Sequence, residues 1–314
     1  MAQKNTSDSS SRKILVTGAS GMIGAGLCNA LINRGDQVIG LSRNPDKARQ
    51  AQPTAEWYGW EPTMGRPPAE ALDAADAVIN LAGEPINQRW NDEVKDRIAR
   101  SRIKATKNLA EAIATAEAKP EIFISGSAIG YYGDRGDDLL YEDAEPGDDF
   151  LADVVVKWEE AADSVAESGL RVAKIRTGHV LDPRGGLLGE LLTPFKLGVG
   201  GPIGSGKQYM SWIHRHDQVG ILLWALDTES ASGPVNATAP NPVTNKEFSK
   251  ALGKAVSRPA IMPIPGFALK AMRGNEFGQI LTEGQRVYPR HATENGYEFK
   301  QPEIDGALAN LLRG

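Results

Sequence analysis

The sequence predicts an α/β fold in which a parallel sheet carries helices on both faces and a smaller lobe follows. Short β-branched runs alternate with amphipathic stretches through the first half of the chain. A glycine-rich turn joins the first of these runs to the first helical stretch. From about Leu187, glycine and proline become frequent and the strand-like runs become short and isolated. Alternating strands and helices need crossover connections, which are typical of a doubly wound, Rossmann-type sheet.

Residues 13–43 form the first predicted unit of strand, glycine turn, helix and strand. The run 13–17 is strand-like, apolar positions from Leu27 to Ile32 predict a helix that ends near Gly35, and 37–41 is the second strand. In that context a Gly-x-x-Gly-x-x-Gly turn predicts a pyrophosphate site at the helix N-terminus. The expected contacts are Gly18, Ser20, Gly21, Met22, Ile23 and Gly24.

The remaining elements follow in chain order. Strands are expected at 77–83, 121–125 and 171–176, and helices at 93–117, 153–168 and 244–256. Asp217 is expected to cap a helix that carries Ile221 and Trp224. Because ligands bind beyond the carboxyl ends of parallel strands, the loops after these strands are the candidate site.

The end of the second strand selects the cofactor. NAD-binding proteins place an acid there for the ribose 2′-hydroxyl, whereas this chain has Ser42 and Arg43, with no acid before Asp46. A guanidinium can hold a 2′-phosphate in a bidentate manner. The sequence therefore predicts NADP(H), with NADPH preferred over NADH. An exposed arginine at a strand end is the alternative interpretation.

These observations divide the chain into three parts. Residues 1–12 are polar and serine-rich, and we expect a disordered leader. Residues 13–186 form the predicted NADP(H)-binding domain, to which a segment around 211–240 returns. Residues 187–314 form the predicted C-terminal substrate lobe of mixed α and β structure.

Composition excludes several classes of partner. The 314 residues carry a formal net charge of −5, which gives no electrostatic case for nucleic acid or an anionic membrane. No apolar run is long enough for a membrane span, and the one cysteine, Cys28, is expected to be a buried, inert thiol. We expect a cytoplasmic monomer or homodimer with a small-molecule substrate. His214 and His216 alternate on an extended segment without further ligands nearby, so no metal site is predicted.

Several motifs resemble a known family. The turn 17–24 and Asn80-Leu81-Ala82-Gly83 resemble the extended, epimerase-like branch of the short-chain dehydrogenase/reductase superfamily. The segments 83–86, 127–133, 157–159, 194–206 and 211–214 narrow the resemblance to the atypical, SDR39U1-like epimerase family proteins, which carry a C-terminal domain of unknown function. The resemblance implies further cofactor contacts at Leu81, Ala82, Gly83, Arg102, Ser125, Lys157 and Val180.

The same resemblance implies a catalytic serine, tyrosine and lysine, and one of the three is missing. Ser127 matches the serine, which holds the reacting oxygen, and Lys157 matches the lysine, which binds the nicotinamide ribose. Four residues before Lys157 the chain has Asp153 in place of the tyrosine. Tyr131 is the expected substitute as proton donor, although Asp153 and Lys157 are equally explained as a structural ion pair.

Two functions therefore stay open at this stage. The first is an NADP(H)-dependent oxidoreductase or nucleoside-sugar-type epimerase that acts on an unidentified small polar substrate. The alternative is a catalytically degenerate, NADPH-dependent sensor or regulatory binding protein, since the missing tyrosine removes the usual proton donor.

Overall fold

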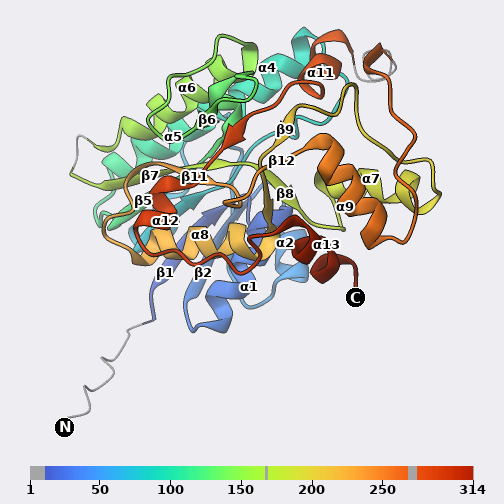
Figure 1. Cartoon of the computed structure of the whole chain (residues 1–314). Helices are drawn as coiled ribbons and strands as arrows, with labels where there is room; N and C mark the ends of the chain where they lie inside the picture. The colour runs from blue at the N-terminus through green and yellow to red at the C-terminus, as the bar shows by residue number, and fades with distance from the viewer. Residues whose placement is uncertain (1–10, 167–168, 268–273, 314) are drawn as a thin grey trace.

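A seven-stranded parallel sheet forms the centre of the molecule (Figure 1). The computed structural model describes residues 11–166, 169–267 and 274–313. The strand order is β11-β7-β5-β4-β1-β2-β3. The strands are β1 (Lys13–Thr17), β2 (Gln37–Ser42), β3 (Glu56–Gly59), β4 (Ala77–Asn80), β5 (Ile122–Ala128), β7 (Arg171–Thr177) and β11 (Gly233–Ala237). The predicted Rossmann-type fold class is confirmed.

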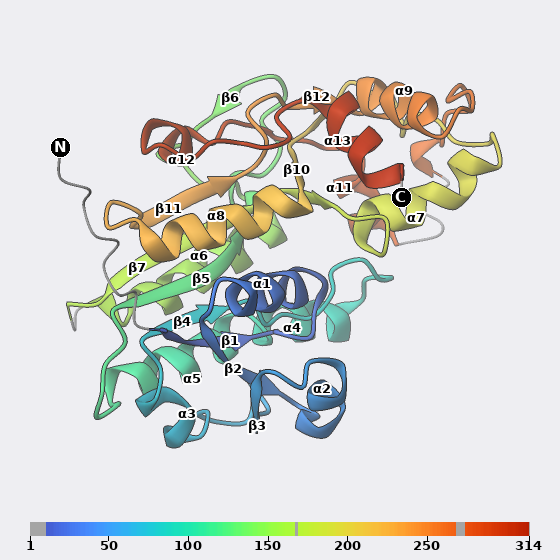
Figure 2. The same ribbon diagram turned by 90° about the horizontal axis from the view of Figure 1, so that it is seen from below.

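Helices cover both faces of this sheet, as the alternation of side chains along the strands requires. On β1, Ile14 and Val16 pack against α1 and α8, whereas Leu15 packs on the other face against α3 and α5. Figure 2 shows α1 and α8 side by side on one face. The helices are α1 (Met22–Asn33), α2 (Pro45–Ala51), α3 (Ala69–Asp73), α4 (Asp92–Arg100), α5 (Ile103–Ala114), α6 (Phe150–Asp163) and α8 (Arg215–Asp227).

The strand order reverses beside β1, and this point positions the candidate site. From β1 the chain continues to β2 and β3 on one side, and it then crosses to β4, β5, β7 and β11 on the other. The turn after β1 and the loop after β4 therefore lie side by side at the carboxyl ends of neighbouring strands. Ligands of open parallel sheets bind at such a switch point.

The helix expected at 93–117 is two helices, α4 and α5, and the prediction of one helix was wrong. The break falls at Ser101 and Arg102, whose side chains bond to the loop after β4. Ser101 Oγ accepts a hydrogen bond from the amide of Glu84 at 2.9 Å, and Arg102 Nη1 donates to the carbonyl of Glu84 at 3.0 Å. These tertiary bonds override the continuous apolar periodicity of the segment.

The C-terminal lobe lies over one end of the sheet (Figure 2). It packs α7 (Gly186–Lys196), α9 (Asn245–Ala255) and α13 (Ile304–Leu312) around Phe195, Trp212 and Phe248. Helix α9 begins at Thr244 with a capping box to Glu247, as predicted. Shorter elements complete the lobe and its connections: η1 (Ile129–Tyr132), α11 (Asn275–Ile280), α12 (Arg290–Glu294), β6 (Leu139–Leu140), β8 (His179–Leu181), β9 (Tyr209–Met210), β10 (Trp212–His214), β12 (Val243–Thr244) and β13 (Arg286–Val287).

Asp217 does not cap α8, contrary to the sequence-based expectation. The cap is His214, whose Nδ1 accepts from the amide of His216 at 3.0 Å. Asp217 is fully buried and accepts hydrogen bonds from the hydroxyl of Tyr297 and from the amides of Lys300 and Gln301. Its carboxylate thus fixes the C-terminal segment against the sheet domain.

The expected leader falls largely outside the described residues, which begin at residue 11. The two leader residues that are described contact the folded domain: Ser11 Oγ donates to the carbonyl of Gly35 at 2.8 Å, and Arg12 forms an ion pair with Asp227. In the ranges that the structure describes, no helix has both the length and the apolar character to cross a membrane.

Candidate functional site

A cleft of about 610 Å³ lies between the turn after β1, the end of β2 and the loop after β4. We call it the glycine-turn cleft. Its lining includes eight of the predicted cofactor contacts: Gly18, Ser20, Gly21, Ser42, Arg43, Leu81, Ala82 and Gly83. Residues from three separate loops therefore meet at the switch point.

The turn after β1 can be built only with glycine at two positions. Gly18 has a φ of +64°, and a Cβ there would lie 2.6 Å from the carbonyl oxygen of Leu81. A Cβ on Gly24 would lie 2.2 Å from the carbonyl oxygen of Gly18. The backbone of the turn consequently packs directly on the loop after β4, and it presents peptide groups to the cleft with no side chain between.

The N-terminus of α1 is open toward an anion. Its N-cap is Gly21, which has no side chain to accept from the amides of the first turn, and the first turn contains no acidic residue. Exposed amides at a helix N-terminus, together with the helix dipole, bind phosphate. This end of α1 fits the pyrophosphate of a dinucleotide.

A buried hydrogen-bond network fixes the loop after β4. Thr17 Oγ1 donates to Asn80 Oδ1 at 2.6 Å and accepts from the amides of Leu81 and Ala82 at 3.1 Å each. Asn80 Nδ2 in turn donates to Thr106 Oγ1 at 2.9 Å. Because the side chains of Thr17 and Asn80 are fully bonded to each other and to this loop, they hold one wall of the cleft rigid.

The far end of the cleft carries two cations. Arg43 and Lys47 both line it, and both side chains are exposed. Asp46, the first acid after β2, instead pairs with Arg49 at 2.9 Å and does not line the cleft. The amide of Asn44 donates to Ser42 Oγ at 3.1 Å, which orders the start of α2. This end of the cleft suits a doubly charged phosphate better than a neutral ribose hydroxyl.

Arg102 lies behind the cleft lining. Its guanidinium bonds to the carbonyls of Glu84 and Ile98 and lies 5.4 Å from the ring of Trp158. Burial lowers the pKa of Arg102 to about 10, with Glu84 acting in the opposite direction. The side chain stays charged at neutral pH and supports the Gly83–Glu84 turn. Its predicted contact with the cofactor stays a prediction.

Ser127 lies in a buried ion-pair cluster. Its hydroxyl donates to Glu159 Oε1 at 2.6 Å. Glu159 also accepts from Arg176, at 2.8 Å from Nε and 2.9 Å from Nη2. All three side chains are buried. The hydroxyl of Ser127 is thus bonded to a buried Glu159–Arg176 ion pair at the end of β5. We call these three residues the Ser127 cluster.

Tyr131 and Tyr132 reach the same cluster in different ways. The guanidinium of Arg176 lies 3.5 Å from the ring centroid of Tyr131. Tyr132 is fully buried and its hydroxyl donates to Asn236 Oδ1 at 2.6 Å. Burial raises the pKa of Tyr132 to about 12, although Arg176 beside it acts to lower it. Tyr131 is therefore the better placed of the two to exchange a proton with a ligand.

Lys157 has its ion-pair partner outside the Ser127 cluster. Its ammonium pairs with Asp153 at 2.7 Å, one turn earlier on α6, and both side chains are more than half exposed. The geometry matches the structural ion pair that the spacing allowed. The predicted roles of Ser127, Tyr131 and Lys157 in catalysis stay predictions, because only the first two share a cluster here.

The other predicted cofactor contacts lie outside the lining of the glycine-turn cleft: on α1, on β5 and in a second hollow. Gly24 and Ser125 are buried, and Ser125 Oγ donates to the carbonyl of Gly126 at 3.0 Å. Met22, Ile23 and Val180 line a second hollow between α1 and α8. That hollow is distinct from the glycine-turn cleft, since the two share no lining residue.

Sequence reasoning missed four residues that shape the site: Thr17, Lys47, Glu159 and Arg176. Lys47 lies in the first turn of α2, only four residues after Arg43, and this closeness in the sequence was the available signal. Glu159 and Arg176 lie on different elements, and no local signal connects them.

The chain belongs to the NAD dependent epimerase/dehydratase family, whose model matches residues 14–237. A domain of unknown function, DUF1731, matches residues 264–311. The expected epimerase-like family and the expected C-terminal domain of unknown function are both confirmed.

Relatives at moderate identity match along most of the chain. The human epimerase family protein SDR39U1 is 37% identical over 304 residues, which cover 96% of this chain and 99% of the relative. An Arabidopsis thaliana homologue of SDR39U1, named as chloroplastic, is 39% identical over 302 residues, covering 96% of this chain and 86% of the relative.

Solved structures agree with the sequence relationship. The crystal structure of human SDR39U1 (isoform 2) with NADPH superimposes with a TM-score of 0.85 at 36% identity, covering 96% of this chain and 99% of that one. A UDP-glucuronic acid 4-epimerase from Bacillus cereus superimposes with a TM-score of 0.77 at 19% identity, covering 96% and 99%, which shows a shared fold.

Proposed function

We propose that this protein is an NADP(H)-dependent oxidoreductase or epimerase of the atypical short-chain dehydrogenase/reductase type, acting on a small polar molecule. The observation that supports this proposal best is the glycine-turn cleft. The uncapped N-terminus of α1 lies at one end of it, and Arg43 and Lys47 line the other. A pyrophosphate and a 2′-phosphate are the two anionic groups of NADP(H), and each has a matching cationic or dipolar partner. The NADPH in the human SDR39U1 crystal supports the same choice.

The bound cofactor would supply hydride exchange, and the chain's own residues would handle the substrate oxygen. The hydroxyl proton of Ser127 is already donated to Glu159. A hydroxyl has one proton and two lone pairs, so in this arrangement Ser127 accepts a hydrogen bond and cannot donate one. A substrate that presents a hydroxyl group fits this Ser127 better than one that presents a carbonyl. Tyr131 would exchange the proton.

The hydrogen bond from Ser127 to Glu159 also favours a second candidate function. A serine held by Glu159 and a lysine held by Asp153 are both occupied by partners within the protein. With the usual tyrosine absent, the fold can bind NADPH and respond to it without turnover. This second candidate is an NADPH-dependent sensor or regulatory protein, in which cofactor binding changes the lobe that Asp217 ties to the sheet domain.

Calorimetric titration of the full chain with NADPH and then with NADH tests the cofactor assignment. We expect NADPH to bind at least tenfold more tightly, about 1.4 kcal/mol. Equal affinities would contradict the proposal. If neither NADPH nor NADH bound, the result would contradict the proposed enzyme. The same result would contradict the NADPH-dependent sensor.

Turnover separates the two candidates. NADP⁺ reduction is followed at saturating cofactor across a panel of small sugars, nucleotide sugars and other alcohols, with Ser127→Ala as the test variant. Because an epimerase returns the hydride and leaves no net NADPH, conversion of each sugar to its epimer is followed in the same samples by chromatography. For an enzyme, Ser127→Ala removes turnover and retains NADPH affinity, whereas Ser249→Ala, a buried serine on α9, serves as the matched control. For a sensor no substrate turns over, and NADPH instead alters the limited-proteolysis pattern of the lobe.

A further inference from the structure

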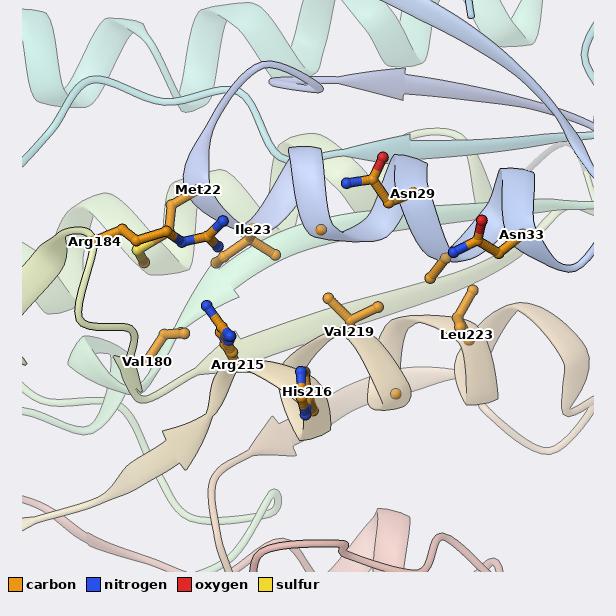
Figure 3. A pocket seen from close by; sticks show the side chains of 13 residues that line it. Met22, Ile23, Asn29, Asn33, Val180, Arg184, Arg215, His216, Val219 and Leu223 are labelled. Carbon is orange, nitrogen blue, oxygen red and sulfur yellow. The ribbon is translucent and has the colours of Figure 1, made fainter. Parts of the chain in front are cut away.

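A groove of about 440 Å³ runs between α1 and α8 and begins at Met22, which directly follows Gly21 of the glycine turn (Figure 3). We call it the helix groove. Met22 and Arg184 lie at one end, and Asn33 and Leu223 lie at the other (Figure 3). From Met22 to Asn33 the helix advances by about 16 Å at 1.5 Å per residue. The groove has the length and volume of a small-ligand site.

The hollow exists because small residues line the contact between the helices. Gly26 faces Val219, and a Cβ on Gly26 would lie 3.3 Å from Val219 Cγ2. Ala30, one turn later on α1, also lines the groove. Beyond the far end, Arg34 Nη1 lies 2.8 Å from Asp227 Oδ2, and neither residue lines the groove. The groove is thus an elongated hollow between the two helices.

The other end carries a surplus of positive charge. Arg184 and Arg215 both line the groove, and both contact one carboxylate, that of the fully buried Asp182. Arg184 Nη2 is 2.6 Å from Asp182, whereas Arg215 Nη1 is at 3.5 Å, the limit of a hydrogen bond. One carboxylate neutralises one guanidinium, so the pair of arginines keeps a net charge of about +1.

Nothing in the first turn of α8 offsets that charge from the groove side. Arg215 is the first residue of the helix, so the positive end of the helix dipole adds to it. The acid of this turn, Asp217, is buried and bonded to Lys300 and Gln301 on the C-terminal segment. His216 also lines the groove. The charged end therefore selects for an anion.

The body of the groove between its two ends is mostly apolar, and Asn29 is the polar side chain among its lining residues there. Ile23, Ala30, Val219 and Leu223 provide its walls, and each is partly exposed. An apolar wall that leads to a pair of guanidiniums matches a molecule with an apolar chain and one anionic head group. A carboxylate suits the planar guanidinium, since the two form paired hydrogen bonds.

We propose that the helix groove binds a medium-chain monocarboxylate, with its carboxylate between Arg184 and Arg215 and its chain along Ile23, Val219 and Leu223. The site is separate from the glycine-turn cleft, and the proposal does not depend on the proposed function. Met22 and Ile23 belong to the first turn of α1, so the ligand lies against the helix whose N-terminus faces the cofactor cleft.

Calorimetric titration of the full chain with octanoate, with and without saturating NADPH, tests this site. Octanamide is the matched neutral ligand of the same chain length. We expect saturable octanoate binding, and binding of octanamide weaker by about tenfold or more, the usual loss when a charge-assisted hydrogen bond is removed. Equal binding of the two ligands, or no saturable binding of octanoate, would overturn the proposal.

Three variants locate the ligand in the groove. Arg215→Gln leaves the close Arg184–Asp182 pair intact, and we expect it to weaken octanoate by about tenfold. Ala30→Leu fills the apolar body and should weaken octanoate and octanamide alike. Arg34→Gln, beyond the far end and outside the lining of the groove, is the control and should leave octanoate affinity unchanged. A larger effect of Arg34→Gln than of Arg215→Gln would overturn the assigned orientation.

NADPH affinity and the melting temperature are measured for each variant to confirm folding. We expect NADPH affinity within about twofold of the unmodified chain, because none of the three residues lines the glycine-turn cleft. Displacement of NADPH by octanoate, or of octanoate by NADPH, would place the carboxylate in the cofactor cleft and overturn the proposal.

Discussion

Removing Arg43 should weaken NADPH binding far more than NADH binding. Arg43 lines the glycine-turn cleft at the end of β2, and its side chain is exposed. A hydrogen bond to a charged group contributes about 1.5–3 kcal/mol, and an exposed site belongs at the low end of that range. Arg43→Ala should therefore lose about 1.5 kcal/mol, which is roughly a tenfold weaker NADPH affinity.

Lys47 lies in the first turn of α2 and acts as a weaker point charge. An exposed ion pair contributes about 0.2–1 kcal/mol, so Lys47→Ala should weaken NADPH by roughly two- to fivefold. The two losses should not add fully in the double variant, because both cations would act on the same 2′-phosphate. NADH has no 2′-phosphate, so its affinity should change by less than about twofold.

Arg49→Ala is the matched control for Arg43→Ala. It removes the same charge from the same helix region, but Arg49 pairs with Asp46 and does not line the cleft. The assay is calorimetric titration with both cofactors at low and moderate salt, since screening should reduce the Arg43 effect. Equal losses of NADPH and NADH in Arg43→Ala, or equal losses in Arg43→Ala and Arg49→Ala, would refute the reasoning.

Three further predictions concern the turn, the Ser127 cluster and acid stability. Gly18→Ala places a Cβ 2.6 Å from the carbonyl oxygen of Leu81 at a φ of +64°, so NADPH affinity should fall by at least about tenfold in titration; near-normal affinity would contradict the turn geometry. Glu159→Gln leaves Arg176 buried without its counter-charge and should cost about 3 kcal/mol of unfolding free energy in urea denaturation; a loss below about 1 kcal/mol would show that the pair is not held as described. Burial raises the pKa of Asp182, but the bonds and charges of its two arginines outweigh that effect and lower it from 3.8 to about 2. Because the folded-state pKa is the lower one, about 2 kcal/mol of stability is present above pH 4 and is lost as the pH falls toward 2. In Asp182→Asn, the free energy of unfolding should fall less steeply between pH 4 and pH 2 in pH-dependent denaturation. An unchanged slope would contradict the lowered pKa of Asp182.

The parts of the fold that the sequence predicted correctly depend on local signals. Gly18 and Gly24 are required by backbone contacts within and beside one turn, so the pattern carries its own explanation. Thr244 and Glu247 cap α9 from positions three residues apart. The runs that became β1 and β2 are short and rich in apolar residues, and a turn or bend follows each. In each case the interacting residues are close in the sequence.

The missed features depend on contacts between distant elements. Ser101 and Arg102 interrupt a helix because the loop at Glu84 bonds to them across 17 and 18 residues. The partner of Ser127 is Glu159, 32 residues away on α6, and no pattern at either position reveals the bond. Apolar periodicity identifies which face of a helix is buried, but it does not identify the polar group that another element places against that face.

The candidate residues for cofactor binding and those for turnover lie in different parts of this molecule, and that separation bears on both candidate functions. The glycine-turn cleft is formed by backbone amides and by Arg43 and Lys47, which are exposed and ready to meet a ligand. Ser127 is instead 4% exposed and bonded to Glu159 within a buried ion pair. A buried ion pair is costly to disturb, since breaking it leaves an uncompensated charge. Substitutions that abolish turnover at Ser127 can therefore leave NADPH affinity intact, and the chain can retain cofactor binding even where the chemistry is weak or absent.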